Sequence, residues 1–169
     1  VFGYMYNYAA ILNGAEPSSA NPSGVQGPCP DGWHVPSVAE YNIMFDYVRD
    51  NFCTRSCPGS VAQSLASNSY WYQGTGLNAP KECTPSYEQE TTNNESGFNV
   101  FPLGVLMGSA ANFDGQSAYL ATTERAMNGT KLQNMYVAIH MAFSTTGYPG
   151  TNRPNFYRQT PIRCVQDPE

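Results

Sequence analysis

The sequence predicts a domain of the α+β class, in which helices come early in the chain and strands come late. Apolar residues recur at helical spacing in the segment that starts near residue 37, whereas apolar and polar residues alternate over residues 135–142. Stretches rich in Gly, Pro, Ser and Asn separate these segments, and the 169 residues contain neither an internal repeat nor an obvious linker. Segregated helices and strands are typical of α+β proteins. A chain of this length fits one domain, which we expect to cover residues 1–169.

The first half of the chain is expected to hold one strand and two helices. Residues 4–8 are rich in aromatic side chains and predict a first strand, and residues 13–30 predict a long loop. The clearest helix begins after Ser37, which precedes Glu40 by three residues in the pattern of a capping box. A short second helix is expected over residues 61–66. The apolar face of the first helix consists of Tyr41, Met44, Phe45, Val48 and Phe52.

The second half is expected to form a small, mostly antiparallel sheet with long loops. Residues 98–102, 118–123 and 162–165 predict short strands, and residues 73–96 and 143–160 predict polar loops. The strongest strand signal covers residues 135–142 because apolar side chains alternate there. Met135, Val137, Ile139 and Met141 are expected on one face, and Tyr136, Ala138, His140 and Ala142 on the other, more polar face.

The composition excludes several classes of protein. Only 12% of the residues are charged, and 8 basic against 13 acidic residues give a net charge of −5. A coiled coil needs far more Lys and Glu, and a nucleic-acid-binding protein needs a basic surface. The longest apolar runs are a few residues long, so no segment is expected to insert into a membrane. Residues 1–124 hold 3 basic and 11 acidic residues (−8), and residues 125–169 hold 5 and 2 (+3).

The five cysteines indicate an oxidising compartment. Cys53 and Cys57 are the only close pair, and neither a second such pair nor a pair of histidines accompanies them, so the spacing does not support a zinc site. Disulfide bonds are the better interpretation, and they form outside the cytoplasm. Cys83 is expected to pair with Cys53 or Cys57. The other two cysteines are Cys29 and Cys164, and an odd total leaves one cysteine unpaired.

Four motifs occur in order along the chain: GYMYN at residues 3–7, SANPSGVQG at 19–27, CPDGWHVPS at 29–37 and IRCV at 162–165. With them the chain resembles the Fibrobacter succinogenes major paralogous domain, an extracellular family of Bacteroidetes-type bacteria. The resemblance spans the whole chain, although residues 96–102 and 121–124 match the family's middle motifs less strictly. It implies a single C-type-lectin-like domain, similar in fold to formylglycine-generating enzymes, and a secreted or cell-surface, non-catalytic module of adhesins. It also implies a disulfide bond between Cys29 and Cys164.

The chain departs from this family in its C-terminal part. Residues 120–124 read LATTE where members usually read WSSTE, and residues 125–160 follow the family poorly. Members rich in Asn and Tyr in this region resemble the targets of diversity-generating retroelements, which mutate adenines in the C-terminal codons of lectin-fold binding proteins. As such a target, the chain would carry a hypervariable binding face over residues 125–158. Sequencing the locus in sibling strains tests this hypothesis, because Asn codons that never vary would contradict it.

No pattern for catalysis or for a cofactor is present in the sequence. His34 and His140 are the only histidines, no Gly-x-Ser-x-Gly motif occurs, and the reactive cysteine pair of formylglycine-generating enzymes is missing. We expect His34 to be structural and His140 to lie either on the sheet surface or against a ligand. A catalytic role would gain support if either histidine lay in a cleft beside a carboxylate with a shifted pKa. Gly74 and Gly76 lack the Lys of a phosphate-binding loop, and the acidic residues are scattered, so neither a cofactor nor a metal is expected.

Binding is the remaining function, and we expect one binding face, built from the strand around residues 136–140 and the loop at 143–160. Aromatic and Arg side chains there offer the large, directional contacts that dominate binding interfaces. The expected ligand is a protein receptor or a glycan on another cell or surface. A structural subunit or spacer of a pilus or cell-surface assembly is the alternative. The expected ligand-binding residues are Tyr136, His140, Tyr148, Arg153, Asn155, Phe156, Tyr157 and Arg158, with Trp71 and Tyr72 at the rim.

Overall fold

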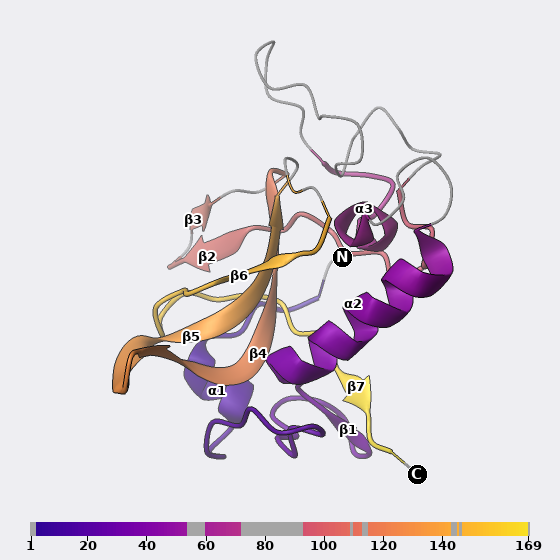
Figure 1. The fold of residues 1–169 in the computed structure, drawn as a ribbon. Helices are drawn as coiled ribbons and strands as arrows, with labels where there is room; N and C mark the ends of the chain where they lie inside the picture. The colour runs from indigo at the N-terminus through magenta and orange to yellow at the C-terminus, as the bar shows by residue number, and fades with distance from the viewer. Residues whose placement is uncertain are drawn as a thin grey trace.

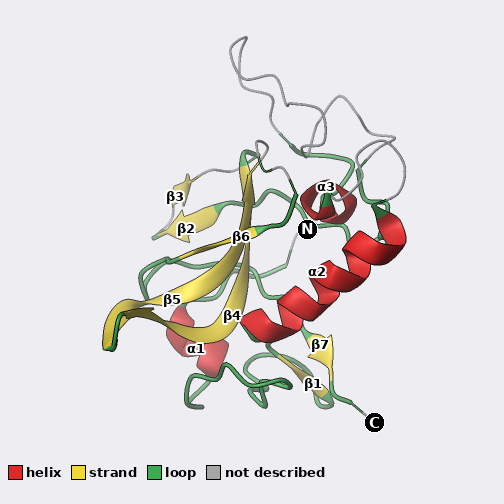
Figure 2. Cartoon of the chain, in the orientation of Figure 1, coloured by secondary structure: helices red, strands yellow, loops and turns green. Residues whose placement is uncertain are grey.

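The computed structural model describes residues 3–53, 60–71, 93–108, 110–112, 115–142, 145 and 147–168. The helices are α1 (Tyr8–Leu12), α2 (Val38–Phe52) and α3 (Val61–Leu65). The strands are β1 (Trp33–His34), β2 (Val105–Met107), β3 (Ala110–Asn112), β4 (Ser117–Asn128), β5 (Lys131–Ala142), β6 (Gly150–Asn152) and β7 (Val165–Gln166). The pairings between these strands are antiparallel: β1 with β7, β2 with β3, and β4, β5 and β6 in one sheet (Figure 1). The helices precede most of the strands, which confirms the α+β class (Figure 2).

The β4–β5 hairpin lies at the centre of the molecule and is covered on both faces. Side chains alternate along β5, so Ile139 and Met141 pack into one hydrophobic core while Tyr136 and Ala138 pack into another. The first core includes side chains of α2 and α3, and the second includes side chains of α1. The alternation predicted for residues 135–142 is therefore correct, but the face expected to be polar is a second core.

A β-bulge in β4 connects the sheet to the start of α2. Ala121 pairs with Ala138, and the next pair is Arg125 with Tyr136. Between these two pairs β4 has three residues, whereas β5 has one. In this bulge the hydroxyl of Thr122 donates a hydrogen bond to the backbone oxygen of Val137 (2.7 Å). Two residues later, a carboxylate oxygen of Glu124 accepts the N–H of Val38 (3.0 Å), the first residue of α2. The bulge thereby satisfies one of the backbone groups that the start of a helix leaves unpaired.

The helix α2 begins as the sequence predicts. The Ser37 hydroxyl accepts the Glu40 N–H (3.3 Å), and the Glu40 carboxylate accepts the Ser37 N–H (2.9 Å), which completes the capping box. The helix extends beside the hairpin (Figure 1). One side of it, with Tyr41, Phe45 and Val48, is buried, and its other side faces solvent. The short helix α3 also lies where it is expected. Among the described residues, no helix is long and apolar enough to cross a membrane.

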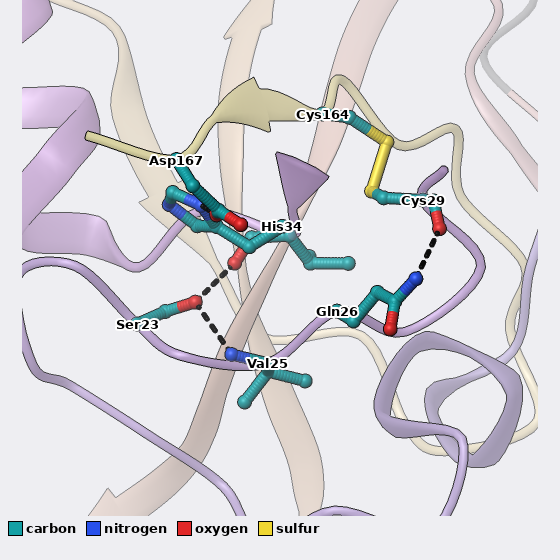
Figure 3. The surroundings of a disulfide bond; sticks show 8 residues. Ser23, Val25, Gln26, Cys29, His34, Cys164 and Asp167 are labelled. Carbon is teal, nitrogen blue, oxygen red and sulfur yellow. Dashed lines mark hydrogen bonds and ion pairs between the residues drawn. A yellow bond between two sulfur atoms is a disulfide. The ribbon is translucent and has the colours of Figure 1, made fainter. Parts of the chain in front are cut away.

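The C-terminal segment is fastened to residues 29–34, beside the start of α2. A disulfide joins Cys29 to Cys164 across 135 residues of sequence, with the two Cα atoms 5.9 Å apart (Figure 3). The strand β7 directly follows Cys164, and it pairs with β1, which begins four residues after Cys29. We call the disulfide and the β1–β7 pair the clasp. The disulfide confirms the pairing that the family resemblance implies.

The prediction of a strand over residues 4–8 is wrong. This segment makes one isolated bridge, between Tyr6 and Thr160, and α1 begins at its end. The side chain of Asn7 accepts the N–H of Ala10 (3.0 Å) and so caps α1. An Asn at this position is a helix start signal that the aromatic pattern around it concealed.

Two later segments also differ from the expectation. Residues 98–102 form no strand, because Asn99 adopts a left-handed backbone conformation (φ 62°) that strands exclude. Part of the expected loop at 143–160 is instead β6, which pairs with the edge of β5. A three-residue strand of Gly, Thr and Asn has no apolar alternation, so its sequence does not reveal it.

Cys53 is a buried residue at the end of α2, and its Sγ lies 3.3 Å from the hydroxyl oxygen of Ser64. Cys57 and Cys83 lie outside the described residues. The expected pairing of Cys83 with Cys53 or Cys57 therefore stays a prediction.

Candidate functional site

Two residues of the expected binding face are core residues. Tyr136 is buried, its ring stacks on Tyr8 with centroids 5.1 Å apart, and its hydroxyl lies 2.8 Å from the hydroxyl of Thr160. Trp71 is buried in the core shared with α2 and α3. Neither side chain offers a surface to a ligand, which corrects the expectation for both. Tyr72, the other rim residue, lies outside the described residues.

Two aromatic residues of the expected loop fasten that loop to other elements. The Tyr148 hydroxyl donates a hydrogen bond to the Asp46 carboxylate of α2 (3.0 Å). The Phe156 ring stacks on Tyr8 of α1, with centroids 4.8 Å apart, and the Arg125 guanidinium lies over it at 5.3 Å. Packing of the loop therefore accounts for both side chains.

The rest of the expected face is divided between half-buried and exposed positions. The His140 ring lies against Tyr119, with centroids 4.6 Å apart, and burial lowers its pKa. None of the described residues forms a hydrogen bond with this ring. The structure thus brings His140 of the central strand β5 against Tyr119 of the neighbouring strand β4. Asn155 and Arg158 are half-buried, and Arg153 and Tyr157 are exposed.

The range expected to vary, residues 125–158, contains core as well as surface. Ala126, Ala138 and Ile139 lie within it and are buried. Close packing makes such positions sensitive to changes of even one methylene group. A hypervariable face in this range, which stays a hypothesis, would therefore have to be confined to exposed positions.

His34 lies between two carboxylates beside the clasp. Its ring is 3% exposed, with Nδ1 2.6 Å from Asp167 Oδ1 and Nε2 2.6 Å from Glu40 Oε1. The other carboxylate oxygen of Glu40 accepts the backbone N–H groups of Ser23 (3.1 Å) and Ser37 (2.9 Å). Figure 3 shows His34 and Asp167 close together beside the disulfide. One imidazole therefore joins the start of α2 to the C-terminal segment, which is 133 residues away from it in sequence.

The surroundings of His34 raise the question of catalysis. Burial alone would lower its pKa, but the hydrogen bonds and negative charges of Glu40 and Asp167 raise the pKa above its usual value. The ring also borders a hollow of about 320 Å³, next to Trp33. These features would suit a catalytic histidine. However, both ring nitrogens are hydrogen-bonded to carboxylates, so neither is available to take a proton from a nucleophile.

An apolar groove of about 450 Å³ lies between α2 and the C-terminal segment. We call it the α2 groove. Ile43 and Tyr47 line it from the solvent-facing side of α2, and they are 57% and 60% exposed. Large apolar side chains gathered at an exposed hollow mark interaction sites. The other lining residues are Asn21, Pro36, Glu40, Tyr41, Met44, Phe98, Arg163, Cys164 and Val165.

Among the charged groups that line the α2 groove, the Arg163 guanidinium is available to a ligand. The Arg163 guanidinium lies over the Phe98 ring at 4.6 Å and makes no ion pair with a described residue. The negative charge of Glu40, by contrast, is engaged by His34. Tyr41 also lines the groove, and its buried hydroxyl has no hydrogen-bond partner among the described residues. The groove therefore suits an apolar group that carries an anion beside it.

Comparison with known proteins identifies the family. A family model described as the Fibrobacter succinogenes major domain matches residues 1–166. The chain belongs to this family. No curated protein and no solved structure matches the chain. The resemblance carried by the motifs is thus confirmed, while the C-type-lectin-like fold stays a prediction.

In this Fibrobacter succinogenes major domain, two family motifs coincide with the clasp. The motif at residues 29–37 contributes Cys29, His34 and the helix cap Ser37. The motif at residues 162–165 contributes the other cysteine of the disulfide. These motif residues therefore build the junction between α2 and the C-terminal strand.

Sequence reasoning missed both the α2 groove and the contacts of His34. Ile43 and Tyr47 lie four residues apart, off the buried face of the predicted helix, and two such apolar residues on the solvent side were the available signal. Asp167 gave no local signal, because 133 residues separate it from His34. The disulfide implied by the family would have placed the two residues near each other.

Proposed function

We propose that this Fibrobacter succinogenes major domain is an extracellular, non-enzymatic recognition module that binds a partner protein in the α2 groove. The observation that carries the proposal is an apolar groove bordered by two exposed side chains, Ile43 and Tyr47. Aromatic and apolar anchors in such positions supply most of the binding energy at protein interfaces. Neither residue belongs to the hydrophobic cores, and both side chains are more than half exposed.

The lining of the groove favours a protein segment over a glycan. A sugar needs polar partners for its hydroxyl groups, whereas the α2 groove is lined mainly by apolar side chains. Arg163 adds a positive charge to this lining, in which the charge of Glu40 is already engaged by His34. We therefore expect the ligand to be an exposed protein segment with an aromatic or aliphatic side chain next to an Asp or Glu.

Two further observations support the rest of the proposal. The Cys29–Cys164 disulfide supports an extracellular location, because such bonds persist in oxidising compartments. The engagement of both His34 nitrogens by carboxylates supports a non-enzymatic role.

Selection from a phage-displayed peptide library tests the proposal. Peptides enriched on the wild-type domain are expected to pair an aromatic or aliphatic residue with an acidic one. Their affinity for the double variant Ile43→Ser/Tyr47→Ser should fall at least about tenfold, because loss of an anchor costs more than about 1 kcal/mol. Tyr157→Ser is the matched control, since it removes an exposed tyrosine that lies outside the groove. Isothermal titration calorimetry measures each affinity.

Three outcomes would contradict the proposal. Peptides that bind the double variant as tightly as the wild type would exclude the groove as the site. Binding on a glycan array without any enriched peptide would exclude a protein ligand. Self-association in analytical ultracentrifugation that Ile43→Ser abolishes would favour the alternative, a structural subunit in which a second copy fills the groove.

A further inference from the structure

The two walls of the α2 groove are connected through His34. Glu40 belongs to α2, which forms one wall, and Asp167 directly follows β7, whose residue Val165 lies on the other wall. His34 itself lies on β1, the strand that pairs with β7. Its two contacts of 2.6 Å therefore link the helix to the C-terminal strand through a single imidazole ring.

The number of protons on His34 decides whether both contacts can be hydrogen bonds. A neutral imidazole carries one N–H, so it can donate to only one of the two carboxylates. Its other nitrogen would then present a lone pair to an ionised carboxylate oxygen, which repels it. The imidazolium carries two N–H groups and donates to Glu40 and Asp167 at once. With both carboxylates ionised, the observed geometry therefore requires the protonated ring.

The two carboxylates are not held equally firmly. Glu40 is 10% exposed, and its second oxygen accepts two backbone N–H groups at the helix start. Asp167 is 51% exposed and follows a strand of two residues. The Asp167 N–H donates to the Gly32 oxygen (2.8 Å), next to β1. When the ring loses a proton, Asp167 is therefore the partner that separates.

We propose that His34 is a pH-sensitive positioning residue that holds the C-terminal strand against β1 while it is protonated and loosens that strand when it becomes neutral. We call the Glu40–His34–Asp167 set the latch. Because β7 borders the α2 groove, loosening it changes the shape of one wall. The latch stands on the contacts above, and its effect on ligand binding rests on the proposed function.

The other charged groups near the ring favour the closed latch. Asp31 lines the same hollow as His34 and Asp167, and its carboxylate accepts a hydrogen bond from Gln26 (3.0 Å). No described Lys or Arg lines this hollow. On the groove side, Arg163 shares a lining with Glu40 but forms no ion pair with a described residue. The acidic surroundings thus favour the imidazolium.

The sign of the pH dependence follows from these contacts. Hydrogen bonds and negative charge raise the pKa of His34 in the folded protein, against the effect of burial. The latch is therefore closed below the usual histidine value of 6.5 and opens as the pH rises through the raised folded value. The disulfide is unaffected by this titration and keeps the C-terminal segment attached.

Amide hydrogen exchange of the wild-type domain, corrected for the intrinsic pH dependence of exchange, tests the latch directly. The protection of the Asp167 amide should fall about tenfold between about pH 5.5 and about pH 8.5, since losing a hydrogen bond to a charged group has an effect of this size. In His34→Gln the protection should be low at both values. His140→Gln is the matched control and should behave as the wild type. If His34→Gln does not fold, Asp167→Asn replaces it in the test. The protection of the amide at position 167 should then not depend on pH, because a carboxamide can form a hydrogen bond with either the neutral or the protonated ring.

The outcomes separate the latch from the proposed function. Protection that does not change with pH in the wild type, or that keeps its pH dependence in Asp167→Asn, would overturn the latch. A pH-dependent amide without any peptide that binds the α2 groove would leave the latch standing and overturn the proposed function. Where groove-binding peptides exist, their affinity for the wild type should change over the same pH range, and that change should be absent from His34→Gln.

Discussion

His34 and His140, the only histidines of the chain, lie in regions that are held together by different forces. His34 is part of the clasp region, where a disulfide and two carboxylates surround it. His140 is on β5, where it lies against the Tyr119 ring and burial lowers its pKa. The clasp is thus held by a covalent bond and by charge, whereas the sheet is held by apolar packing on both faces.

This difference gives the two regions opposite responses to pH. The stability that His34 contributes is fully present below its usual pKa and is lost as the pH rises through its raised folded value. The folded pKa of His140 is lowered, so the unfolded chain binds the additional proton, and stability is lost as the pH falls through that lowered range. Each histidine therefore reports on its own region.

Removing the disulfide should have the largest effect on the clasp. Cys29→Ser/Cys164→Ser is expected to lower the free energy of unfolding by about 2–5 kcal/mol, because the bond closes a long loop and restricts the unfolded chain. Urea unfolding of the double variant, compared with oxidised and reduced wild type, measures the loss. A loss below about 0.5 kcal/mol, the range of ordinary surface substitutions, would show that the clasp does not depend on this bond.

Breaking the latch should have a smaller effect that depends on pH. His34→Gln is expected to cost about 1–3 kcal/mol at about pH 5.5, because it leaves the Glu40 carboxylate, which is 10% exposed, without its charged partner, and less at about pH 8.5. Ile139→Val, a truncation in the core of the sheet, should cost about 0.5–1.5 kcal/mol and equally at both values. Urea unfolding at the two pH values compares them. Equal losses for His34→Gln at both would remove the distinction between the regions.

Removing the cap of α2 should cost less again. Ser37→Ala is expected to lower stability by about 1 kcal/mol, because the Glu40 N–H loses its partner at the helix start. Thermal unfolding followed by circular dichroism measures the change. If Ser37→Ala also lowered the protection of the Asp167 amide at low pH, the cap and the latch would be one cooperative unit rather than two.

A substitution on the exposed loop should have the smallest effect. Tyr157→Ser is expected to change stability by less than about 0.5 kcal/mol, since the side chain is exposed. Denaturant unfolding at a single pH is sufficient. A loss above about 1 kcal/mol would mean that this tyrosine packs against the fold in solution, and it would no longer serve as the control for the α2 groove.

Local patterns in the sequence predict the parts of the fold that depend on neighbouring residues. The capping box at Ser37 and Glu40 is an example, because both partners lie within one helical turn. The alternation along β5 is another, and it correctly assigns Ile139 and Tyr136 to opposite faces. The same alternation cannot show what covers each face. It therefore predicts a polar surface where the structure has a second core.

The candidate site was harder to predict because it joins distant segments. The α2 groove needs a helix and the last strand to lie together, and no spacing within either segment encodes that arrangement. Asp167 has a role in the site only because the fold brings its carboxylate within 2.6 Å of the His34 ring. The two residues are 133 positions apart in sequence, so no local pattern connects them. By contrast, Trp71 and Tyr136 looked like binding residues because aromatic side chains serve cores and interfaces equally well.

Titration of the two imidazoles by nuclear magnetic resonance tests the central claim most directly. Proton chemical shifts of the His34 and His140 rings, assigned with His140→Gln, give both values in the same sample. We expect the pKa of His34 to lie above the usual value of 6.5 and the pKa of His140 to lie below it. A His34 ring that titrates at or below that value would contradict a protonated link between α2 and the C-terminal strand.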